Sequence, residues 1–190
     1  MKIYEHIDNN IITEDLNLSL NSPKELLDHM KQNFKYKYSE KNYRVSSAEE
    51  LEKKKYGVCQ DFTLYQSEFF SKNNYKYWVV FIQHKYYNAT HTFNIIEMDG
   101  KLFWFEFSFG KYQGIYGPYS NNESVVKDVA DKMHDFSNAR ENKNKPNKYN
   151  YKIFDEIPYS SGMDMNQFLG SVGYNFEWGK DNRIKKNTGV

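Results

Sequence analysis

Two strand-like runs joined by Asp99-Gly100 constrain the fold of this 190-residue chain more than any other feature. Residues 90–98 and 101–108 are rich in β-branched and aromatic side chains. Asp-Gly between such runs predicts a β-hairpin, because this dipeptide accepts the positive φ angles of a type I′ turn. With a two-residue loop, Met98 pairs with Lys101, so the numbers of paired residues sum to 199.

This register has a consequence for two polar residues. Glu106 faces Phe93, and His91 faces Ser108. Since side chains two apart on a strand share a face, His91 and Glu106 are diagonal neighbours on one face of the sheet. A slip of one residue would place them on opposite faces. The hairpin therefore predicts that the glutamate accepts a hydrogen bond from the imidazole.

Cys59 is the single cysteine of the chain, and it follows Gly57 where a loop gives way to a helical pattern. Phe62, Tyr65 and Phe69 recur at the interval that buries one face of a helix. In the first helical turn, unpaired N–H groups and the helix dipole favour thiolate over thiol. Cys59 is thus a candidate nucleophile; the alternative is a small buried core residue, the commonest role of a free cysteine.

Capping patterns and periodicity predict the other elements. The box Ser47-Ala48-Glu49-Glu50 precedes a short helix expected from Leu51 through the lysines at 53–55. Further helices are expected over about 23–35, over about 120–133 as a cover for the sheet, and over 165–169. Strands are expected over 75–82, at the sheet edge over 151–154, and around residues 3–7. Residues 109–118 and 138–150 are expected to be a turn-rich connector and an exposed loop. The pattern is an α+β fold with an antiparallel sheet.

Length and composition are typical of one domain, expected over 1–178 with its core at about 45–118, followed by a mobile tail over 179–190. A net charge of +1 argues against a nucleic-acid partner. We find no apolar run of the length that a signal peptide or a membrane span needs. With one cysteine no intrachain disulfide is possible, which fits a cytoplasmic location.

Cysteine chemistry on acyl groups needs a thiolate, a histidine that transfers its proton, and a group that orients the ring. Cys59, His91 and Glu106 are the candidates for these three roles. The order of helix-borne cysteine, histidine opening one strand, and acid on the next strand is more specific than any of the three alone.

At this point the chain resembles the transglutaminase-like superfamily of papain-like thiol enzymes, and most closely its small stand-alone bacterial members. The resemblance covers about residues 45–118 and rests on Ser47-Ala48-Glu49-Glu50-Leu51, Gly57-Val58-Cys59-Gln60-Asp61-Phe62, His91-Thr92-Phe93 and Trp104-Phe105-Glu106. It implies an α+β fold in which a helix bearing the nucleophile packs on an antiparallel sheet bearing the other two residues. The third residue of the family triad is usually aspartate, and Glu106 stands in that position.

The resemblance leaves the reaction open among proteases, deamidases, amide hydrolases, acyl transferases and inactive relatives. We predict that Cys59 attacks an amide or acyl carbonyl of a peptide or protein, that its N–H is one oxyanion donor, and that Asp61 braces the helix start. Gln60 is adjacent, but the sequence does not identify a second donor. Hydrolysis without a metal or organic cofactor is preferred to cross-linking, because water is the default acceptor for a small chain.

Three alternatives remain. His84 and His91 with Cys59 and Glu106 would be a zinc set, although their spacing is not that of a zinc motif. A small-molecule acyltransferase would use the same triad. A catalytically silent module would present the aromatic segment 112–119 to a protein partner. The histidines at 6, 29 and 134 have no partner pattern and are expected on the surface or in helix packing.

Overall fold

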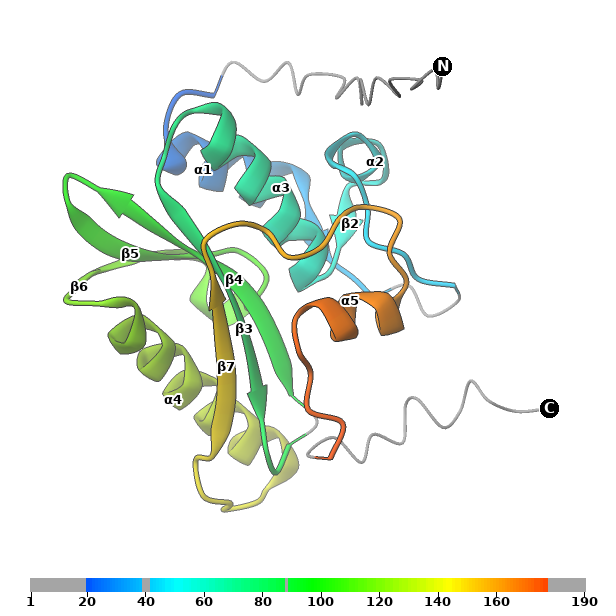
Figure 1. Ribbon diagram of the computed structural model, residues 1–190, viewed down its shortest axis with the longest axis vertical. Coiled ribbons are helices and arrows are strands. Elements are labelled where there is room, and N and C mark those ends of the chain that lie inside the picture. The colour runs from blue at the N-terminus through cyan, green and yellow to red at the C-terminus, as the bar shows by residue number, and fades with distance from the viewer. Residues whose placement is uncertain (1–19, 39–41, 88, 178–190) are drawn as a thin grey trace, which may run out of the picture.

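The computed structural model describes residues 20–38, 42–87 and 89–177. The strand expected around residues 3–7 and the tail expected over 179–190 lie outside these residues. The described chain is an α+β structure built on a five-stranded antiparallel sheet of order β6-β5-β4-β3-β7 (Figure 1). Its strands are β3 (Tyr77–His84), β4 (Thr90–Met98), β5 (Lys101–Glu106), β6 (Gly114–Tyr119) and β7 (Tyr149–Phe154).

Five α-helices and a short strand pair complete the described residues. The helices are α1 (Pro23–Asn33), α2 (Ala48–Lys54), α3 (Cys59–Lys72), α4 (Asn122–Glu141) and α5 (Met165–Ser171). Strand β1 (Lys35–Tyr36) pairs in parallel with β2 (Tyr56–Gly57), directly before the cysteine helix.

The β4–β5 hairpin has the predicted register. Met98 pairs with Lys101, and the ladder continues without a shift to Asn94 and Phe105. Asp99 and Gly100 have φ angles of 51° and 70°, as a type I′ turn requires. The second strand ends at Glu106, two residues earlier than expected.

The sheet is covered on both faces, with α3 and α1 on one side and α4 on the other (Figure 1). Successive side chains of β3 alternate between the two layers. Val80 and Ile82 pack with α4, whereas Val79 and Phe81 pack with α5 and the segment before it. Because both faces are buried, the strand is a continuous apolar run instead of an alternating one. The confirmed α4 stripe consists of Val125, Val126, Val129, Ala130 and Met133.

Capping residues fix where the helices begin. Ser47 and Glu50 form the predicted reciprocal capping box of α2, with N–H···O distances of 2.9 and 3.2 Å. The pattern Ser120-Asn121-Asn122-Glu123 predicts a capping box with Ser120 as the cap of α4, and this prediction was wrong. Asn121 caps α4 instead, because its Oδ1 accepts a hydrogen bond from the Ser124 N–H at 2.8 Å.

The segment from 109 to 118 was expected to be a connector without regular structure, but it contains two regular elements. It forms a 3₁₀ turn over Gly110–Tyr112 and then strand β6. Gly114, Gly117 and Pro118 are typical of turns, but β6 lies at the sheet edge, where a residue without an N–H is tolerated.

The exposed loop expected over 138–150 is also shorter than expected. Helix α4 continues through Glu141 and ends at Asn142, whose φ of 49° allows its N–H to donate to the Asn138 carbonyl. Strand β7 begins at Tyr149 and forms the predicted sheet edge. The loop between the two elements therefore spans 142–148.

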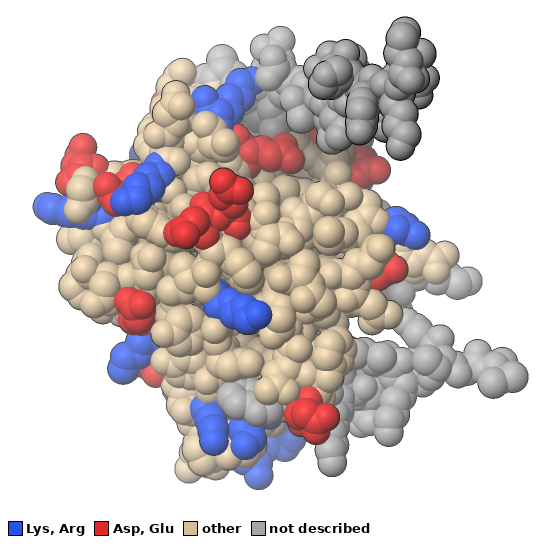
Figure 2. All heavy atoms as spheres, viewed as in Figure 1, with Lys and Arg blue, Asp and Glu red and all other residues tan. Residues whose placement is uncertain are grey.

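The face seen in Figure 2 carries charges of both signs, with a small group of Lys and Arg side chains at its lower end and Asp and Glu side chains in its upper middle. This distribution accords with the formal net charge of +1. Among the described residues, none of the helices combines the length and apolar character that crossing a membrane requires.

Candidate active site

The N-terminus of α3 positions Cys59 as the first helical residue, as predicted. The chain turns into this helix through Gly57, where an added Cβ would lie 2.9 Å from both Asp61 Oδ2 and Leu51 Cδ1. Only glycine fits this close approach without displacing the carboxylate. Cys59 itself is partly exposed.

Asp61 braces this turn, as predicted. Its side chain is buried, and its Oδ2 accepts a hydrogen bond from the Val58 N–H at 2.9 Å. Its Oδ1 accepts from the Ser46 N–H at 2.7 Å and from the Tyr43 hydroxyl at 2.9 Å. The carboxylate thus ties the segment before α2 to the start of α3.

The hairpin brings His91 and Glu106 together as the register predicted. His91 Nε2 lies 2.7 Å from Glu106 Oε2, and both side chains are buried. Glu106 accepts further hydrogen bonds from the Trp104 indole at 3.1 Å and from the Phe109 N–H at 2.7 Å. With this many donors, the carboxylate is held in one orientation toward the imidazole.

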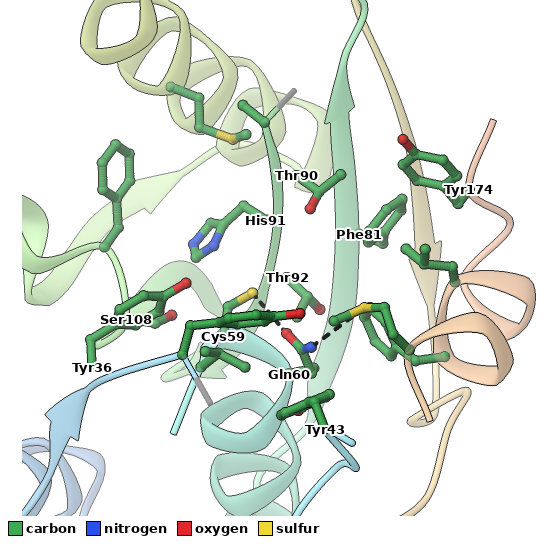
Figure 3. Close-up of a pocket in the computed structure, with 18 of the residues that line it drawn as sticks. Tyr36, Tyr43, Cys59, Gln60, Phe81, Thr90, His91, Thr92, Ser108 and Tyr174 are labelled. Carbon is green, nitrogen blue, oxygen red and sulfur yellow. Dashed lines mark hydrogen bonds between the residues drawn. The ribbon is translucent and has the colours of Figure 1, made fainter. Parts of the chain in front are cut away.

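The electrostatics favour a protonated imidazole. Burial lowers the pKa of His91, but the charge of Glu106, the neighbouring Cys59 sulfur and the hydrogen bond to Glu106 outweigh burial and raise this pKa to about 10. Because Nε2 contacts Glu106, Nδ1 is the ring nitrogen left for Cys59. The cysteine and histidine side chains line the same cavity (Figure 3).

This cavity is a cleft of about 810 Å³. One wall belongs to α4 and carries Phe136 and Arg140, and the opposite wall belongs to α5 with Phe168 and, beyond the helix, Tyr174. Cys59 lies between these walls. The volume is in the range of sites that hold small ligands or a few peptide residues.

His84 does not join the cluster. Its Nε2 lies 3.2 Å from His134 Nδ1, and the two rings stack with their centroids 5.3 Å apart. His134, expected on the surface or in helix packing, is half-buried on α4 and pairs with His84 of β3. Within 20–38, 42–87 and 89–177, no group of three or more His, Cys, Asp and Glu side chains is placed to hold a metal ion.

Sequence reasoning missed three neighbours of the candidate triad. Trp104 was named only as part of the Trp104-Phe105-Glu106 motif, with no role in the site; it is fully buried, and its indole donates to Glu106. Its position two residues before the acid, on the same face of the strand, was a usable signal. Tyr43 and the inward-pointing side chain of Gln60 had no local signal.

An α+β fold with a cysteine at a helix start and a histidine–carboxylate pair on adjacent strands defines a papain-like thiol arrangement. Residues 2–115 match the model of a family described as a transglutaminase-like domain. Because the match spans more than half of the chain, the protein belongs to the transglutaminase-like family. No curated protein matches the chain.

Proposed function

We propose that this protein is a thiol enzyme that attacks amide or acyl carbonyl groups of peptides or proteins. Cys59 is the nucleophile, His91 transfers the proton, and Glu106 orients the imidazole. The observation that supports this proposal best is the buried 2.7 Å contact between His91 and Glu106 beside a cysteine in an open cleft. Membership of the transglutaminase-like family agrees with this chemistry.

In the proposed reaction, the sulfur of Cys59 bonds to the carbonyl carbon while the π electron pair moves to oxygen. The intermediate then collapses, the carbon–nitrogen bond breaks, and His91 gives its proton to the leaving amine. The neutral imidazole next takes a proton from water, whose oxygen attacks the thioester. Cleavage of the carbon–sulfur bond restores thiolate and imidazolium. The scheme uses water as the acceptor and no metal or organic cofactor.

The first experiment measures the rate of iodoacetamide alkylation of Cys59 at pH 6. An activated thiolate reacts fast at this pH, and replacing the imidazole removes the activating charge. We expect His91→Ala to slow the reaction about tenfold or more, while His29→Ala, a control histidine outside the cleft, leaves it unchanged.

A slow reaction that is equal in the parent and in His91→Ala would contradict the proposal. In that case the alternative of a catalytically silent binding module would be favoured. If the parent reacts fast, acyl-group chemistry is tested next with p-nitrophenyl acetate, and amide hydrolysis with ammonia release from glutamine-containing peptides.

A further inference from the structure

The side-chain amide of Gln60 has unusual surroundings. The residue is 3% exposed, and in the described residues the hydrogen-bond partners of its amide are two sulfur atoms. The Cys59 thiol donates to Oε1 at 3.2 Å, and Nε2 faces Met165 Sδ at 4.0 Å (Figure 3). A thioether is a weak acceptor. A buried amide with weak partners lowers the stability of the folded protein, which indicates a role for Gln60 other than packing.

Gln60 is also held in place from a distant part of the chain. The Tyr159 hydroxyl donates to the backbone carbonyl oxygen of Gln60 at 3.0 Å. Met165, whose sulfur faces the Gln60 Nε2, is the first residue of α5. Both contacts come from residues after 115, where the family match ends. The backbone of Gln60 is therefore held in the wall of the cleft, with its side-chain amide next to the sulfur of the candidate nucleophile and, among the described residues, free of strong partners that would oppose its rotation.

The chemistry of the proposed function needs a donor at this position. When Cys59 bonds to a carbonyl carbon, negative charge develops on an oxygen attached to that same carbon. The N–H of Cys59, in the first turn of α3, is one donor for this oxyanion. A group that already lies 3.2 Å from the sulfur reaches the oxyanion as well.

We propose that the Gln60 side-chain amide is the second oxyanion donor, an inference that rests on the proposed function. With a protonated thiol, Oε1 accepts the thiol proton. Once that proton has moved to His91, rotation about the Cγ–Cδ bond brings an N–H of the same amide toward the sulfur and the oxyanion. Gln60 is then a catalytic residue that acts in the tetrahedral intermediate and in the transition states around it.

Two reactions of the same sulfur test this role. Acylation by p-nitrophenyl acetate passes through an oxyanion, whereas alkylation by iodoacetamide displaces iodide and forms none. Gln60→Met keeps the length of the side chain and removes the donors. We expect acylation to fall about 10²- to 10³-fold and alkylation to change less than about threefold. Met165→Leu, a packing control in the same wall, should leave the ratio of the two rates near the parent value.

The alkylation rate also reports whether the site is folded. If Gln60→Met does not fold, Gln60→Glu retains the shape of the side chain, and an ionised carboxylate likewise cannot donate. For either variant, an unchanged ratio of acylation to alkylation would overturn the inference while leaving the proposed function intact. A parent whose alkylation does not depend on His91 would instead overturn the proposed function, and this inference with it.

Discussion

The indole nitrogen of Trp104 lies 3.1 Å from Glu106 Oε2, the same oxygen that lies 2.7 Å from His91 Nε2. The tryptophan is fully buried, so its N–H has no competing water. Trp104 is a positioning residue in this arrangement, because it acts on the imidazole through the carboxylate and does not contact the cysteine.

Replacing Trp104 with phenylalanine tests this role. The loss of one hydrogen bond to a buried carboxylate should cost about 1 kcal/mol of unfolding free energy and slow Cys59 alkylation at pH 6 roughly fivefold. Trp78→Phe, on β3 of the same sheet, is the control and should leave the alkylation rate unchanged. A loss of unfolding free energy without a change in the alkylation rate would show that Trp104 contributes to packing alone.

Asp61→Asn should destabilise the start of α3. The amide keeps the size of the carboxylate but presents N–H groups to the N–H of Val58 or Ser46, which now donate to oxygen. Such a mismatch at a buried site costs about 1–3 kcal/mol. Urea denaturation measures this loss, with Asp131→Asn on α4 as an exposed control. A change below about 0.5 kcal/mol would argue against the bracing role.

Stability should fall as the pH rises from 6.5 to 10. The folded protein raises the pKa of His91 from 6.5 to about 10, so the folded state retains a proton in this window that the unfolded chain has lost. The stabilising contribution is complete below pH 6.5 and disappears as the pH passes 10. Urea unfolding of the parent and of His91→Asn should therefore converge at high pH. Parallel curves would contradict the prediction.

For the pair of His84 and His134 we predict that the free energy of unfolding falls as the pH decreases in the acid range. Burial, followed by the neighbouring His134, lowers the pKa of His84 to about 4. Its contribution to stability is present above pH 6.5 and is lost as the pH falls through 4, because the unfolded chain binds the proton first. His84→Gln should flatten this part of the profile, and Thr90→Ser should not. A slope unchanged in His84→Gln would rule out the pair as its source.

Phe136→Ala should affect substrate binding more than stability. The ring lines the cleft at 42% exposure and lies edge-on to Phe109. We expect a KM for peptide substrates about three- to tenfold higher, an unchanged alkylation rate, and a stability loss below about 1 kcal/mol. Tyr151→Ala on β7 is the matched control, with 40% exposure outside the cleft lining. Equal KM effects in the two variants would exclude a specific role of Phe136.

Local signals explain why much of the fold and of the candidate triad were predictable. The Asp99-Gly100 turn fixes the register of two strands, and the register alone places His91 beside Glu106. Gln60 had no such signal, because the hydroxyl that holds its carbonyl belongs to a residue 99 positions away. Strand β6 was missed because edge strands accept the glycines and proline that otherwise indicate turns.

The cleft walls have an evolutionary consequence. Cys59, His91, Glu106 and the groups that orient them lie before residue 115, whereas α4 and α5 follow the segment that matches the family. Two walls of the cleft thus come from the part of the chain after the family match, whereas the candidate triad lies within the match. Substitutions in the later segment would therefore reshape these two walls without replacing Cys59, His91 or Glu106.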